Sequence, residues 1–209
     1  MNFKHFWKAG WDWLREPLHF GVVLLALVPV GYALVYMDYH GQPAPYTDDW
    51  VFGSNIAVEV KQGTLGWDDL LQDYNGHRYL LTNLQIVFFT LLTDWNLRAE
   101  MWVNPLLIML NLGLILLLLG WQQPRAVRLA LVPLSALMFA LSQELNLLVG
   151  FQSSWHFVTL LILLGLAGVR RASAGWLSFG VLVGRGLAGD LLVWDRRAVL
   201  GGGGGWRWL

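Results

Sequence analysis

The chain has 209 residues, of which 56% are hydrophobic and only 13% are charged. Soluble domains carry about 25% charged residues, so this composition indicates an integral membrane protein. The formal net charge is zero, which argues against a nucleic-acid partner. The chain has no cysteine, and this excludes disulfides, zinc thiolate sites and a cysteine nucleophile.

Three long apolar runs predict membrane-spanning helices, because a helix needs about 20 mostly apolar residues to cross a bilayer. Residues 17–37 and 101–124 contain no charged residue, and residues 129–169 contain only Glu144. The third run is long enough for two spans, with the stretch LLVGFQSSW as the turn between them. We therefore expect an all-α, polytopic transmembrane helical bundle of four or five spans.

The distribution of charge predicts the orientation, because short basic loops face the cytoplasm. Segment 1–16 is therefore predicted to be a cytoplasmic amphipathic lead. Residues 38–78 contain seven acidic residues against two basic ones, so the loop 38–100 is expected on the extracytoplasmic side. The basic residues that flank the predicted spans are Lys4, Lys8, Arg15, Arg125, Arg128, Arg170 and Arg171.

Residues 79–93 lie between two points that this orientation places outside, so we expect them not to cross the membrane. The stretch is short for a span and contains polar residues such as Asn83 and Gln85. It is predicted to form a peripheral or re-entrant helix in the outer leaflet. The alternative is a short true span, which would invert the orientation of everything after it.

The C-terminal segment 172–209 loses the pattern of the earlier spans. A fifth span over residues 174–194 would contain both Arg185 and Asp190, and the chain ends in the low-complexity stretch GGGGGWRWL. We interpret this segment as the degenerate or truncated tail of a longer membrane protein.

The stretch PYTDDWVF places two adjacent carboxylates, Asp48 and Asp49, soon after the first span. One of them could act as a general base, or the pair could hold a divalent cation such as Mg²⁺ or Mn²⁺. The alternative is that they are hydrated or cap a helix. The similar stretch WDD at residues 67–69 shows that such a pair also fits a helix N-terminus.

The stretch DYNGHR at residues 73–78 brings a second set of polar groups, Asn75, His77 and Arg78. Arg78 could bind a phosphate with its guanidinium fork, and His77 could donate to the phosphate or transfer a proton. Asn-Gly is also a common turn. Glu144 and Gln152 are expected on the same membrane face as these residues, although Glu144 could equally be an interfacial side chain that reaches water.

Residues 17–171 resemble the GT-C class of membrane glycosyltransferases, and more narrowly an uncharacterised bacterial group of multi-span proteins. The stretches that carry the resemblance are DDWVF, DYNGHRYLLTNLQIVFFTLLTDWNLRAEMW and QELNLLVGFQSSW. Members of the group often have Asn-Glu-His-Arg where this chain has Gly76 in place of the acid.

The resemblance implies a protein of the bacterial inner membrane that transfers a sugar from a polyprenyl-phosphate donor to an outer-face acceptor. It implies that Asp48 or Asp49 is the base or metal ligand, and that His77 and Arg78, with Asn75 beside them, contact the lipid phosphate. Glu144 and Gln152 would line the pocket. The alternative function is that of a non-enzymatic membrane scaffold or assembly component. A transporter is a weaker alternative, because we find no internal repeat.

Overall fold

The computed structural model describes residues 17–74, 76–119 and 124–171. Within these ranges, four helical stretches are long and apolar enough to cross a membrane. The expected all-α transmembrane bundle is therefore confirmed, and the chain is a multi-pass membrane protein by the length and composition of its helices. The predicted lead 1–16, Asn75 and the fifth span over residues 174–194 lie outside the described residues.

The four spans are α2, a continuous run of α6 and α7, the broken pair α8 and α9, and α10. Their bounds are α2 (Pro17–His40), α6 (Leu97–Met101), α7 (Val103–Leu119), α8 (Pro124–Met138), α9 (Glu144–Leu148) and α10 (Ser153–Arg171). The two predicted spans within residues 129–169 are thus confirmed. The span that was expected to begin at residue 101 begins at Leu97 instead.

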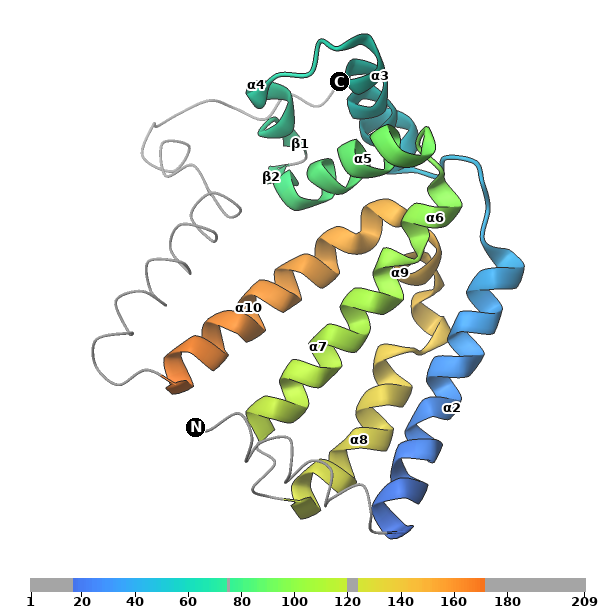
Figure 1. The fold of residues 1–209 in the computed structure, drawn as a ribbon, viewed down its shortest axis with the longest axis vertical. Helices are drawn as coiled ribbons and strands as arrows, with labels where there is room; N and C mark the ends of the chain where they lie inside the picture. The colour runs from blue at the N-terminus through green and yellow to red at the C-terminus, as the bar shows by residue number, and fades with distance from the viewer. Residues whose placement is uncertain (1–16, 75, 120–123, 172–209) are drawn as a thin grey trace, which may run out of the picture.

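The bundle is built from two helix pairs, α2 with α8 and α7 with α10, and α7 also contacts α8 (Figure 1). Val30, Ala33 and Met37 of α2 form a buried apolar cluster with residues of α7 and of the α8–α9 region. The Ser135 hydroxyl donates a hydrogen bond to the Ala26 carbonyl at 2.6 Å. A small polar residue at a helix contact lets two helices approach closely, and this bond joins α8 to α2.

One end of the bundle carries all of the short elements, and we call it the cap end. The C-terminal end of α2, the N-terminal ends of α7 and α10, and α9 all lie there (Figure 1). The cap itself consists of residues 41–96. Its elements are the π-helix η1 (Asp49–Gly53), α3 (Ser54–Gln62), α4 (Trp67–Leu70), β1 (Asp73–Tyr74), β2 (His77–Arg78) and α5 (Leu80–Thr93).

Helix α5 lies across the cap end of the bundle and packs on α3, α6 and α10 (Figure 1). It is apolar but shorter than the four spans. Because α2 ends and α7 begins at the same end of the bundle, the chain returns to its starting side without α5 crossing. This arrangement agrees with the expected peripheral helix over residues 79–93.

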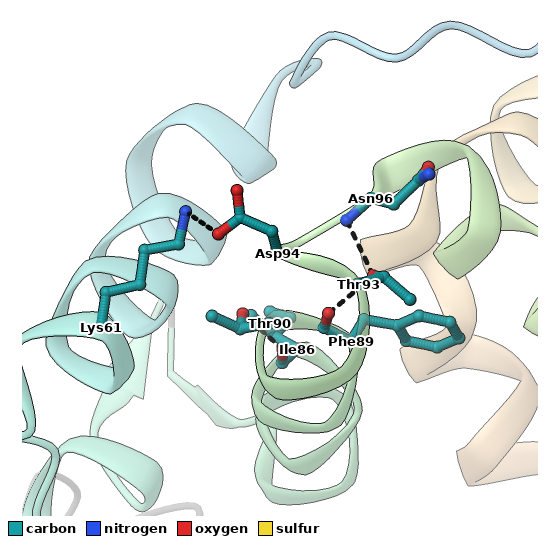
Figure 2. A network of polar contacts seen from close by, with 7 residues as sticks. All are labelled: Lys61, Ile86, Phe89, Thr90, Thr93, Asp94 and Asn96. Atoms are coloured by element: carbon teal, nitrogen blue, oxygen red, sulfur yellow. Dashed lines mark hydrogen bonds and ion pairs between the residues drawn. The ribbon is translucent and has the colours of Figure 1, made fainter.

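The turn from α5 to α6 is held by the Thr93 side chain at the end of α5 and by one ion pair to α3 (Figure 2). The Thr93 hydroxyl donates to the Phe89 carbonyl at 2.6 Å and accepts from the Asn96 backbone N–H at 3.0 Å. Asp94 forms an ion pair with Lys61 at 2.8 Å. Asp94 and Trp95 both have left-handed backbone, with φ of 58° and 61°. This conformation is uncommon for a bulky residue such as Trp95, so the surrounding contacts must hold it in place.

The placement of α5 is testable because the chain has no native cysteine. We expect Asp68→Cys, before α5, and Asp94→Cys, after it, to react with a membrane-impermeant maleimide from the same side of the membrane. Lysed membranes, in which both positions are accessible, give the control for full labelling. Labelling from opposite sides would mean that α5 spans the membrane.

Candidate functional site

Asp49 occupies an unusual stretch of backbone. Thr47, two residues earlier, is a β-branched residue with φ of 48°, which is a rare conformation for that side chain. Asp49 then begins the π-helix η1, and short π-helical turns occur frequently at functional sites. Its Oδ2 accepts a hydrogen bond from the Tyr46 backbone N–H at 3.3 Å. Asp49 therefore lies in irregular backbone, and its carboxyl group accepts a hydrogen bond from that backbone.

The two adjacent acids have different environments. Asp49 is only 3% exposed, whereas Asp48 is half-buried. Burial raises the pKa of Asp49 from 3.8 to about 6, against hydrogen bonds from the backbone of Tyr46 and Phe151, and the charge of Asp48 raises it further. A carboxyl with this pKa titrates close to neutral pH, as general bases commonly do.

Asp49 and Glu144 line one cavity of about 330 Å³ at the cap end. Glu144 is the first residue of α9, directly after the break in the third span, and its side chain is exposed. Its Oε2 accepts a hydrogen bond from the Tyr36 hydroxyl of α2 at 2.7 Å. His40 and Tyr46 also line this cavity.

His77 and Arg78 line a different cavity, a smaller groove of about 120 Å³ between the β2–α5 region and α10. Its other lining residues are mostly apolar, among them Leu81 and Leu161. Both polar residues are exposed, and no ion pair to Arg78 is found among the residues that the structure describes. The structure therefore divides the predicted site residues between two cavities.

Asp48 is connected to the groove by its interactions with two tyrosines. Its Oδ1 accepts a hydrogen bond from the Tyr74 hydroxyl at 3.1 Å. The pKa of Tyr79, which lines the groove, is raised first by burial and then by the charge of Asp48. The side chains of the paired acids thus face different surroundings, Asp49 in the larger cavity and Asp48 near the groove.

Two further predicted substrate-binding residues, Gln152 and Asn75, do not line either cavity in the part of the chain that the structure describes. Gln152 is half-buried in η3 (Gly150–Gln152) and is not among the lining residues of either cavity. Asn75 lies outside the described residues. Its neighbour Gly76 has φ of 77° and donates its backbone N–H to Asp73 Oδ1 at 2.9 Å. An acid at position 76 would be strained in this turn, which gives a physical reason for glycine there.

The predicted metal site has few ligands in the structure. The described residues contain no group of three or more His, Cys, Asp or Glu that could hold a metal ion. Because Asp48 and Asp49 face different surroundings, either one alone would suit only an ion whose remaining ligands are mostly water and substrate phosphate, as Mg²⁺ often has. In the second acidic pair, Asp69 Oδ2 accepts from the Gly66 N–H at 2.8 Å, so Asp69 does cap a helix.

A buried polar cluster beneath the larger cavity was not anticipated from the sequence. Glu100 is fully buried in α6 and accepts hydrogen bonds from Gln85 Nε2 at 3.0 Å and from Trp95 Nε1 at 3.2 Å. Gln85 Nε2 also donates to the Gly150 carbonyl at 3.3 Å. Asn104 Nδ2 donates to the carbonyls of Leu147 and Val149 at 3.2 and 2.8 Å.

One sequence signal could have found this cluster. Glu100 stands directly before an uncharged apolar run, where a charged residue is ordinarily taken as the boundary of the span. The polar residues Gln85 and Asn104 lie in apolar helices on either side of it. Hydrogen-bonding side chains in otherwise apolar helices predict buried polar partners, because lone polar groups are costly in such surroundings.

Comparison of the chain with protein-family models, with curated proteins and with solved structures finds no match.

The raised pKa of Asp49 predicts how stability depends on pH. Well below about pH 4 the group is protonated in both the folded and the unfolded chain, so burial carries no charge penalty. The penalty grows as pH rises from about 4 to about 6 and is complete above that range. At about 1.4 kcal/mol per pKa unit it amounts to about 3 kcal/mol.

We therefore expect wild type to lose stability relative to Asp49→Asn as pH rises from about 4 to 7.5. Thermal unfolding of both proteins in the same detergent measures the difference. The exposed Asp68→Asn is the matched control and should show no such trend relative to wild type. A difference between wild type and Asp49→Asn that does not change with pH would contradict the buried, raised-pKa carboxyl.

Gly150 has no room for a side chain. A Cβ at this position would lie 2.8 Å from both Cγ and Cδ of Glu100. We expect Gly150→Ala to destabilise the protein by about 1–3 kcal/mol through overpacking. Gly113→Ala in α7, where a Cβ meets nothing within 4 Å, is the control and should be neutral or slightly stabilising. Equal unfolding midpoints for the two variants would show that the Glu100–Gly150 contact is not tight.

Proposed function

We propose that this protein transfers a sugar from a polyprenyl-phosphate donor to an acceptor hydroxyl at the cap end, on the outer face of a bacterial inner membrane. The observation that supports this most is the environment of Asp49. It is a buried carboxyl that lines a cavity, follows a strained residue, and has a pKa of about 6. Strongly perturbed carboxyl groups in cavities are candidates for acid–base chemistry.

In the proposed reaction, Asp49 is the general base. Its carboxylate takes the proton of the acceptor hydroxyl while the acceptor oxygen attacks the anomeric carbon of the donor sugar. A new C–O bond forms to the acceptor, and the bond from the anomeric carbon to the phosphate oxygen breaks. The electron pair of the broken bond leaves with the polyprenyl phosphate, so all atoms and charges are accounted for without a metal ion. General-base catalysis of this type contributes roughly 10²–10⁴-fold.

The groove at β2 and α10 suits the lipid part of the donor. Arg78 carries a guanidinium fork, which matches phosphate oxygens, and His77 lies beside it. The apolar residues below them on α5 and α10 would accommodate an isoprenoid chain. Asp48, bonded to Tyr74 and close to Tyr79, lies at the edge of this groove. Glu144 belongs to the cavity of Asp49, whereas Gln152 has no role in this scheme.

The experiment is a transfer assay on the full chain in lipid nanodiscs. Radiolabelled undecaprenyl-phosphate hexoses and pentoses serve as donors, a membrane extract supplies acceptors, and loss of label from the lipid is measured. We expect Asp49→Asn to slow transfer by about 100-fold or more. For wild type, the rate should rise with pH through about 6, because the base must be ionised.

Asp68→Asn is the control, because Asp68 is an exposed acid of the second acidic pair, outside both cavities. It should transfer at the wild-type rate. Transfer by Asp49→Asn at the wild-type rate would refute the assigned base. If wild type transfers no sugar from any donor of the panel, the scaffold or assembly function becomes the better explanation.

A further inference from the structure

The charged side chains that line the larger cavity are acidic. Its polar lining contains two carboxyl groups, Asp49 and Glu144, and no lysine or arginine is among its lining residues. The arginine nearest along the adjoining helix, Arg98, is paired with Asp38 at 2.9 Å and is not part of the lining. A ligand with a negative charge would therefore meet two carboxyl groups, and the imidazole of His40 is the only basic side chain in the lining.

Aromatic and hydroxyl groups complete the polar lining. The rings of Tyr36 and His40 lie with their centroids 4.2 Å apart, and the Tyr36 hydroxyl is fixed by its hydrogen bond to Glu144. Tyr46 is 53% exposed and also lines the cavity. Carboxylates that accept hydrogen bonds from hydroxyl groups, next to aromatic rings that cover C–H faces, form a surface suited to a sugar.

The size of the cavity fits one small group. Its volume of about 330 Å³ lies at the lower end of the range of small-molecule sites, roughly 300–1,000 Å³. Leu97, Leu148 and Val149 provide an apolar part of the wall. The smaller groove, by contrast, is where the described chain places an exposed arginine without an ion pair. The two cavities therefore differ in the charge that they accept.

We infer that the larger cavity binds a carbohydrate group that carries no negative charge, and that it binds an ammonium-bearing sugar more tightly than a neutral one. This inference rests on the proposed function, in which the hydroxyl of the bound group gives its proton to Asp49. It adds the chemical class of the acceptor: sugar phosphates and uronic acids are excluded from this cavity.

The test uses one introduced cysteine, because the chain has none. Ala44 is exposed and lines the cavity, so Ala44→Cys reports on it, while Thr64→Cys is an exposed reference in the cap outside it. The rates of modification by a trimethylammonium-ethyl and a sulfonatoethyl methanethiosulfonate are measured at both positions in nanodiscs. We expect the cationic-to-anionic rate ratio at Ala44→Cys to exceed the reference ratio by about tenfold. Adding Glu144→Gln should reduce this excess.

Protection of Ala44→Cys then identifies the ligand class. Methyl glucoside, glucosamine and glucose 6-phosphate are the probes, and we expect glucosamine to slow modification most and glucose 6-phosphate not at all. A ratio equal to the reference, protection by the phosphate, or no protection by either uncharged or amino sugar would overturn the inference. Since modification requires no turnover, protection by glucosamine together with a failed transfer assay would refute only the transferase proposal.

Discussion

The structure depends on how it satisfies the backbone of one broken span. Helix α8 ends at Met138 and α10 begins at Ser153, so the intervening segment must find hydrogen-bond partners at or near the depth of the membrane. Asn104, Gln85 and Gln143 donate to five backbone carbonyls in and beside this segment. The acceptors are Leu137, Met138, Leu147, Val149 and Gly150. Leu137, Val149 and Gly150 also accept a hydrogen bond from a backbone N–H. Met138 and Leu147 rely on the side chains of Gln143 and Asn104, and a buried carbonyl without a partner costs several kcal/mol in hydrocarbon.

The same segment forms part of the candidate site. Gly150 lies against Glu100 so closely that no Cβ fits, and the next residue, Phe151, uses its backbone to hydrogen-bond Asp49. The Phe151 ring also packs on Phe52 of the π-helix, with centroids 5.6 Å apart. The position of Asp49 is therefore set by a rigid turn between two spans and not by its own loop alone. Packing of this kind is what holds a reactive group within the narrow geometry that catalysis requires.

The sequence predicted the parts of the fold that follow from composition and failed where long-range packing decides. The four spans follow from the length of the apolar runs. The peripheral placement of α5 follows from the basic residues, which put the segments before and after it on the same side of the membrane. The difference between Asp48 and Asp49 could not be predicted, because Asp49 contacts the backbone of Phe151, which is about a hundred residues away in the sequence. The burial of Glu100 was missed for a different reason: its partners Gln85 and Trp95 are close in sequence, but a charged residue before an apolar run is ordinarily taken as the boundary of a span.

The burial of Asp49 is easier to explain by chemistry than by stability. The carboxyl is buried near a second carboxyl, Glu100, with which it interacts electrostatically, and two like charges in a poorly solvated region oppose folding. The cost for Asp49 alone is about 3 kcal/mol at neutral pH, a large fraction of the stability of an ordinary domain. An uncharged polar residue such as asparagine or serine could accept a backbone hydrogen bond here without that cost. A carboxyl is needed only if the cavity must accept a proton or a positive charge, and the proposed deprotonation of a bound hydroxyl would meet the first of these requirements.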